Sequence, residues 1–266
     1  MKSGSIVVLQ WFRAALILAL CQNGAVFGQQ GARPKNTSVA VPTVGCKTRG
    51  QVEDTDGPPA GTIRLPVSSK VAQQLSYYQA VEGFGVLAPR GWFCLEFSGS
   101  GGGPLFISPI PIDTDTVFTD EGGFHGPAIE LDVELGPSTR IDVAKVVALV
   151  FPAYGEFVTA VMTSFDLRAG SITFGPYPDD ILSYKSKREV WYETPPQTAG
   201  LGTHSRLRMN ASPIHGLAML LGEIAVQEGK TPDLLLLSVR LAPEQADLIP
   251  TIIRELERQE VRRKPN

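Results

Sequence analysis

The stretch Ala128-Ile-Glu-Leu-Asp-Val-Glu-Leu135 alternates strictly between apolar and acidic side chains. Successive side chains of a β-strand point to opposite faces, so this alternation predicts a strand with one buried face and one face in solvent. The turn residues Gly136-Pro137 follow. Thr139-Arg-Ile-Asp142 then matches a capping box, and apolar residues continue from it at helical spacing to Phe151. The middle of the chain therefore combines a strand with a helix.

Further strands and helices are predicted on both sides of this segment. Two short strands, 92–97 and 105–107, form a hairpin around a glycine-rich connection. Three more strands are expected at residues 184–192, 214–221 and 234–241. Helices are expected from Ser68 until Gly83 and Gly85 end the first, over 157–165, and over 243–261, where Pro250 kinks or restarts the last. We therefore expect an α+β fold in which an antiparallel β-sheet is flanked by helices.

Residues 1–28 have the features of a secretory signal peptide. Lys2 and Arg13 are basic, residues 14–21 are apolar, and no acidic residue precedes Glu53. Gly28 is a small residue that suits signal peptidase, so cleavage is expected before Gln29. The apolar run is too short to cross the ~30 Å core of a membrane. We expect a secreted or periplasmic protein with no stable membrane span after signal removal.

The cysteine count agrees with export. Cys21 leaves with the signal peptide, and Cys46 and Cys94 remain. An even pair in an oxidising compartment predicts a disulfide, and two buried free thiols are the alternative. A bridge between these positions would stabilise the fold by roughly 4 kcal/mol on the loop-entropy model.

Composition divides the rest of the chain into three parts. Residues 29–60 are polar, small and proline-containing without any period, and they are expected to form a disordered or loosely ordered lead-in. Residues 61–261 are expected to form a single α+β domain, followed by a basic tail at 262–266. Hydrophobic residues make up 43% of the chain and charged residues 19%, which is typical of a folded protein.

The sequence lacks residues that common cofactor-binding and metal-binding motifs require. Gly99-Ser-Gly-Gly-Gly103 is followed by Pro104 and another strand, where a dinucleotide-binding loop needs a helix, so it reads as a hairpin tip. The acidic loop that starts at Asp113 has Val117, Phe118 and Phe124 where an EF-hand needs an oxygen ligand, a glycine and a glutamate. We therefore expect no metal and no cofactor.

Two patterns leave catalysis open. Glu130, Asp132 and Glu134 share one strand face, a stripe that can bind a hard cation or transfer protons, although alternation favours a plain solvent face. The histidines are in no zinc or triad motif; they are His125, His204 and His215. A dispersed hydrolase site would need a pocket that joins one of them to a carboxylate and a hydroxyl. No catalytic residue is assigned.

Basic and aromatic side chains interleave near the predicted strand 184–192, at Tyr184, Lys185, Lys187, Arg188, Trp191 and Tyr192. Such a composition can bind a nucleic acid or a sugar. The formal charge of −3 argues against a nucleic acid. A strand whose Lys and Arg stems lie over packed aromatic rings is the favoured interpretation.

The segment Gly85-Val-Leu-Ala-Pro-Arg-Gly-Trp92, followed by two strands, resembles the entry to the PsbP-like fold of extrinsic photosystem subunits and small exported bacterial proteins. The order of elements over residues 61–261 is also similar. This resemblance implies an α/β/α sandwich and supplies no catalytic positions. With Gly175-Pro-Tyr-Pro178 and Gly200-Leu-Gly-Thr203, the chain also resembles a group of uncharacterised secreted bacterial proteins.

The turn at Pro89 and Gly91 gives the two candidate binding residues. Its geometry points Arg90 outward and anchors Trp92 in the core, and an exposed Trp92 would instead contact a ligand directly. The sequence thus favours an exported, non-catalytic binding or accessory module for an unknown protein or small ligand of the cell envelope or medium. The alternative is an exported hydrolase with a dispersed Ser/His/Asp or metal-assisted site.

Overall fold

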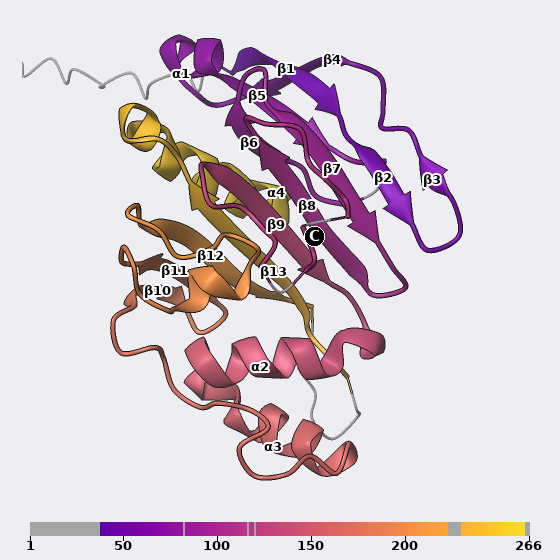
Figure 1. The fold of residues 1–266 in the computed structure, drawn as a ribbon, viewed down its shortest axis with the longest axis vertical. Coiled ribbons are helices and arrows are strands. Elements are labelled where there is room, and N and C mark those ends of the chain that lie inside the picture. Colours follow the sequence, from indigo (N-terminus) through magenta and orange to yellow (C-terminus); the bar gives the residue numbers. More distant parts are fainter. Residues whose placement is uncertain (1–37, 82, 116, 120, 223–229, 264–266) are drawn as a thin grey trace, which may run out of the picture. The chain divides into compact units, whose positions relative to one another are not determined.

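The computed structural model describes residues 38–81, 83–115, 117–119, 121–222 and 230–263, and these residues form strands in two sheets together with four α-helices (Figure 1). The predicted signal peptide, residues 29–37 of the lead-in and residues 264–266 of the basic tail lie outside this range. Within it, no helix is long and apolar enough to cross a membrane. The α+β class is confirmed.

The small sheet has four strands and the large sheet has nine. The order in the small sheet is β4 (Gly61–Leu65), β1 (Val39–Gly45), β5 (Leu75–Gln79) and β6 (Val86–Pro89). The order in the large sheet is β10 (Ile181–Ser186), β11 (Glu189–Thr194), β12 (Ile214–Leu221), β13 (Asp233–Arg240), β9 (Ala128–Glu134), β8 (Gly102–Ser108), β7 (Phe93–Ser98), β2 (Lys47–Gly50) and β3 (Asp54–Thr55). The large sheet is antiparallel except where β2 joins β7.

The helices are α1 (Ser69–Gln74), α2 (Arg140–Val150), α3 (Gly155–Ser164) and α4 (Ile249–Arg263), and short 3₁₀ turns form at Pro137–Thr139, Pro152–Tyr154, Leu201–His204 and Pro243–Leu248. The predicted helices at 139–151 and 157–165 are therefore present. The C-terminal helix restarts near Pro250 as predicted, because a proline in the first helical turn lacks only an N–H that would have no partner there.

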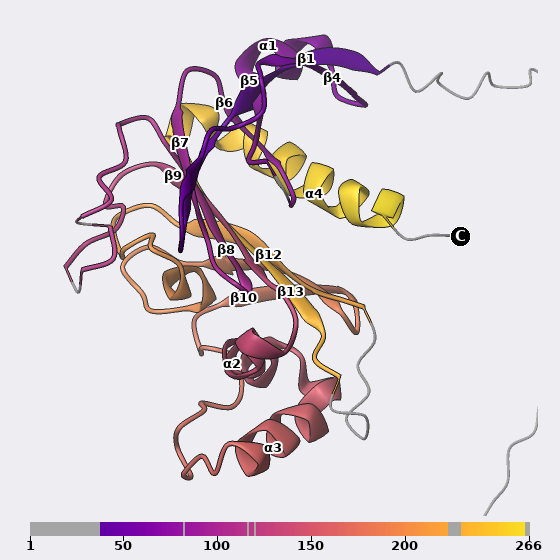
Figure 2. The ribbon, with the colours of Figure 1, turned by 90° about the vertical axis from the view of Figure 1, so that its right-hand side faces the viewer.

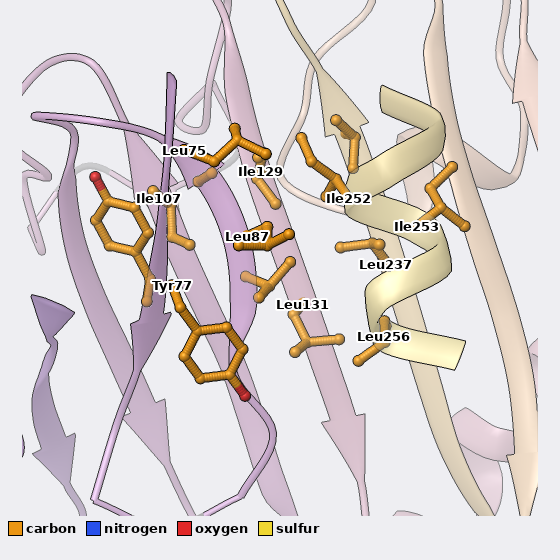
Figure 3. Packing of buried hydrophobic residues seen from close by; sticks show 14 of the residues in the cluster. Leu75, Tyr77, Leu87, Ile107, Ile129, Leu131, Leu237, Ile252, Ile253 and Leu256 are labelled. Carbon is orange, nitrogen blue, oxygen red and sulfur yellow. The ribbon is translucent and has the colours of Figure 1, made fainter. Parts of the chain in front are cut away.

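One face of the large sheet packs against the small sheet and α4 (Figure 2). Ile129 and Leu131 of β9 meet Leu75 and Leu87 of the small sheet, and Leu256 of α4 closes the same cluster (Figure 3). All five are at most 1% exposed, and burial of each such side chain contributes on the order of 1.5–3 kcal/mol. This cluster forms the larger of the cores.

The opposite face is also covered, which corrects the prediction of a solvent face on β9. Val147 of α2 and Phe157 of α3 pack over Val190, Leu220 and Leu236 of the sheet. A further aromatic cluster lies over β8 and the adjoining loops. Because both faces are covered, the acidic side of β9 lies inside the protein.

Two other expectations are wrong. Residues 38–60 are not a loose lead-in, since they supply β1, β2 and β3, and the domain extends upstream of residue 61. The helix that begins at Ser68, whose hydroxyl accepts the N–H of Val71, ends at Gln74 rather than near Gly83. The following residues pair with β1 and β6, and burial of Leu75 and Tyr78 in the small sheet outweighs their helical spacing.

The predicted strand 184–192 is in fact two strands. β10 and β11 form a hairpin whose turn includes Lys187 and Arg188. The pairing has an irregularity between Tyr184 and Ser186, so regular pairing covers residues 181–184.

Cys46 and Cys94 form a disulfide with a Cα–Cα distance of 5.3 Å. Cys46 lies where the chain leaves β1 of the small sheet and enters β2 of the large sheet, and its N–H still donates to the carbonyl of Gln79 on β5. Cys94 lies on β7. The bridge thus fastens the crossing strand to the large sheet at the point where it changes sheets.

Candidate functional site

The loop that contains the candidate binding residues Arg90 and Trp92 makes structural contacts within the protein. The Arg90 side chain is exposed, but its Nε donates to the carbonyl of Leu75 at 3.1 Å and its Nη2 to that of Ala72 at 2.5 Å. Arg90 therefore satisfies carbonyls at the end of α1. Trp92 is half-buried against the main core, and its backbone N–H donates to the Tyr78 hydroxyl at 3.0 Å. Gly91 has the positive φ, 79°, that the predicted turn requires.

The acidic stripe of β9 is buried at Glu130 and half-buried at Asp132 and Glu134. Glu130 is only 5% exposed, and one of its carboxylate oxygens accepts the N–H of Arg206 at 2.5 Å. Burial, with repulsion from Asp132, raises the pKa of Glu130 to about 8 despite that hydrogen bond and the nearby cations Arg206 and Arg208.

Its two neighbours behave in the same way. Burial raises the pKa of Asp132 to about 6 and that of Glu134 to about 8, and the two carboxyl groups are hydrogen-bonded to each other. In the described part of the chain, no group of three His, Cys, Asp or Glu side chains is arranged to hold a metal ion. The stripe is a set of carboxyl groups whose pKa values are all raised above their ordinary values.

The three histidines occupy different surroundings. His125 is exposed in a loop. His204 lies beside Tyr177, with 2.8 Å between its Nε2 and the tyrosine hydroxyl, in a small hollow that also includes Lys145. Desolvation and, to a smaller extent, Lys145 lower the pKa of His204 against the opposing effect of Asp180. That hollow includes no carboxylate among its described lining residues.

His215 lies in a pocket of about 200 Å³ between the large sheet and α4, which we call the His215 pocket. Strand pairing sets Glu193 of β11 directly opposite His215 of β12, and 3.4 Å separates the Glu193 Oε2 from the His215 Nδ1. The other side-chain walls are mostly apolar: Ile181 and Ser183 of β10, Trp191 of β11, and Ile249, Pro250 and Ile253 of α4.

Trp191 is held in place from two sides. Its indole N–H donates to the carboxylate of Glu257 on α4. The Nζ of Lys185 lies over its ring, 4.9 Å from the centroid, which is cation–π geometry. The basic and aromatic run thus brings the ammonium group of a lysine on β10 over an aromatic ring on β11, where the sequence favoured lysine and arginine stems over packed rings of one strand.

The pocket joins a histidine, a carboxylate and a hydroxyl, but not in the order that a nucleophilic triad needs. Ser183 is on β10 and His215 on β12, with Glu193 on the strand between them. Ser183 lies opposite Trp191, which lies opposite Leu217, so two strand spacings of about 9–10 Å and a further two residues along β12 separate its backbone from that of His215, whereas a nucleophile must hydrogen-bond its base. Among the described residues, no hydrogen bond joins them.

The sequence drew attention to His215 and to the run 184–192 that contains Trp191, but not to Ser183 or to the pocket that these residues form. Glu193 and His215 meet only through the register of β11 on β12. The α4 residues Ile249 and Ile253 lie in the helix predicted over 243–261. Pairing the predicted strands in antiparallel register could have placed Glu193 beside His215.

Comparisons with protein-family models, with curated proteins and with solved structures found no match to this chain. The PsbP-like sandwich and the membership of a secreted bacterial group stay predictions.

Proposed function

We propose that this chain is an exported, non-catalytic binding protein that holds a small, largely apolar ligand in the His215 pocket. The observation that carries the proposal is the convergence of apolar walls from β10, β11 and α4 on a single His–Glu pair. Small-molecule sites are typically concave and apolar, with a few placed polar groups that fix orientation.

The pocket chemistry defines the class of ligand. Its volume of about 200 Å³ is below the 300–1,000 Å³ usual for drug-sized molecules, so one ring or a short chain fits. Glu193 accepts hydrogen bonds, and Trp191 supplies an aromatic wall beside a second carboxylate, Glu257. An apolar body with a donating head, such as an ammonium or hydroxyl group, suits these walls better than a carboxylate does.

A hydrolase remains the alternative because the pocket contains all three residue types that a dispersed site requires. The position of Glu193 between Ser183 and His215 supports binding over nucleophilic catalysis. Covalent labelling of Ser183 by a fluorophosphonate, located by peptide mass mapping, would favour the hydrolase and contradict the non-catalytic proposal.

Binding can be tested with two probes that share a ring and differ in charge. Saturation-transfer NMR should detect benzylamine on the protein and detect benzoate weakly or not at all. The Ser183→Phe variant fills the pocket from an exposed strand position and should abolish the benzylamine signal. The Ser186→Phe variant, on the same strand but outside this pocket, is the matched control and should keep it.

The export half of the proposal has its own test. The intact mass of protein recovered from the periplasm or medium should correspond to a chain that begins at Gln29. A mass that includes residues 1–28 would contradict cleavage at that site.

Equal binding of both probes, or benzylamine binding unaffected by Ser183→Phe, would contradict the assignment of the His215 pocket.

A further inference from the structure

The large sheet ends in an edge strand that carries features of an interface. Among the strands that the structure describes, β10 pairs only with β11, and all but one of its six residues are exposed. Ile181 is 61% exposed and Tyr184 50%, which is high for large hydrophobic side chains. An exposed edge strand presents unpaired N–H and C=O groups to any chain that can pair with them.

The other described strand edges are less suited to pairing. At the far end of the large sheet, β3 has only two residues. In the small sheet, β6 is buried throughout and contacts α4, while β4 carries Arg64, whose side chain donates to the carbonyl of Ser38. β10 is therefore the long, open edge of the part of the chain that the structure describes.

Hollows flank β10 on both faces. On the α4 side, Ile181 and Ser183 line the His215 pocket. On the side of α2 and α3, Tyr184 lines a second apolar hollow of about 330 Å³ together with Pro152 and Ala153. A strand added to a sheet edge places alternate side chains on the two faces, where such hollows receive them.

Charges along β10 indicate what kind of strand fits. The exposed carboxylate of Asp179 precedes the strand, and the cations Lys187 and Arg188 follow it. An antiparallel copy of the same segment sets the acidic end of each strand against the basic end of the other. The segment is therefore complementary in charge to itself.

We propose that two copies of this chain pair through β10, antiparallel, about a two-fold axis at Ser183. In this register Leu182 of one copy lies opposite Tyr184 of the other on the α2–α3 face, and Asp179, which precedes β10, lies toward the turn that carries Lys187 of the other copy, once on each side of the axis. Such a two-fold contact is the commonest kind in homo-oligomers. The inference shares Ile181 and Ser183 with the proposed ligand pocket, but it is argued from the exposure and charge of β10, not from that ligand.

Two features that protect edges in other proteins do not block this pairing. A lysine on an edge strand usually repels a neighbour, but the charge of Lys185 lies over the Trp191 ring, on the face of the sheet. The irregularity between Tyr184 and Ser186 leaves residues 181–184 in regular register.

Sedimentation velocity of the exported protein over a wide concentration range is the first test, and a monomer–dimer equilibrium is expected. Asp179→Lys and Lys187→Glu should each raise the dissociation constant by about tenfold or more, since each reversal creates two repulsive pairs. Mixing the two variants should restore a heterodimer, because every reversed charge then meets its opposite. Lys70→Glu, an exposed reversal on α1, is the control and should change nothing.

Cross-linking provides the register. Residues opposite each other across antiparallel strands have Cβ atoms about 4.5–5.5 Å apart, so Ser183→Cys should form an oxidised dimer. Ser186→Cys should not, because it lies opposite Asp180. The proposal is overturned if the protein is monomeric throughout and the charge-swap mixture forms no heterodimer. It is equally overturned by a dimer that neither reversal weakens and that Ser183→Cys does not trap, since that dimer uses another surface.

Discussion

Replacement of Glu130 by glutamine should make the protein more stable at alkaline pH and flatten the dependence of its stability on pH. Glu130 is enclosed by Phe106 of β8 and Ser238 of β13, which lie opposite it in the sheet, and by the loop that carries Arg206. Glutamine keeps the size of the side chain and an acceptor for the Arg206 N–H. It removes the carboxyl group that keeps its proton in the folded protein and loses it when the chain unfolds.

The magnitude follows from the pKa. The pKa of Glu130 is about 8 in the folded protein against an ordinary value of 4.5. Below pH 4.5 both states bind the proton and the free energy of unfolding is unaffected. Between pH 4.5 and 8 only the unfolded state is ionised, so stability falls by about 1.4 kcal/mol per pH unit, with a ceiling near 5 kcal/mol. Relaxation around the ionised group lowers this, and we expect a gain of about 2–3 kcal/mol for Glu130→Gln at pH 8.5.

The other ionisable groups near Glu130 do not reverse this sign. Asp132 raises its pKa, and Arg206 and Arg208 lower it by less than burial raises it. The raised pKa values of Asp132 and Glu134 act in the same direction, so part of the pH dependence should survive in the variant.

Urea unfolding at pH 5, 7 and 8.5, followed by circular dichroism, measures the effect. Glu156→Gln, an exposed position on α3, is the matched control and should follow the wild type at each pH. If Glu130→Gln lost stability between pH 5 and 8.5 as steeply as the wild type, the assignment of a buried, protonated Glu130 would be refuted.

Three further outcomes are expected from the same unfolding measurements. Arg90→Ala should lower the free energy of unfolding by about 1–2 kcal/mol because the carbonyls at the end of α1 lose their donors, whereas an Arg90 free for binding would leave it unchanged within about 0.5 kcal/mol. Trp92→Ala should cost about 2–3 kcal/mol, less than a fully buried aromatic, and a variant as stable as the wild type would contradict its packing on the core. Reduction of the Cys46–Cys94 bridge should cost about 2–4 kcal/mol, and two reactive thiols in unfolded, non-reduced protein would show that the bridge is absent.

Where the sequence carried strong periodicity, it predicted the structure well. The strand β9, the helix α2 and the β7–β8 hairpin lie where alternation, helical spacing and a glycine-rich turn placed them. The predicted capping box of α2 does not form, because the Thr139 hydroxyl donates to the carbonyl of Gly136 and caps no N–H of the helix. In each case the local pattern and the tertiary packing favour the same structure. The restart of the last helix near Pro250 has the same origin.

The failures have a common physical cause, which is burial by distant parts of the chain. Residues 39–45 form the strand β1 because β4 and β5 pair with them on both sides, and their sequence shows no alternation of apolar and polar residues that predicts a strand. Glu130 and its neighbours were expected in water because alternation reports only that one face is apolar. Whether the other face is covered depends on a loop more than seventy residues away, which places Arg206 against Glu130.

The position of the proposed site follows from the same coverage. In the middle of the large sheet, β9 and β13 have apolar or closely paired side chains on both faces, and their residues are almost all buried. Fewer helical residues cover the sheet toward β10. On one face Glu257 of α4 accepts the indole N–H of Trp191. On the other face the hydroxyl of Tyr154, at the start of α3, accepts a hydrogen bond from Arg188. Both helical layers therefore cover β10 only in part, through Leu182 on the α2–α3 face and along the His215 pocket on the α4 face. A sheet wider than its covering layers must leave its last strand exposed with a hollow on either face, and this is why the ligand pocket and the proposed pairing surface meet at β10.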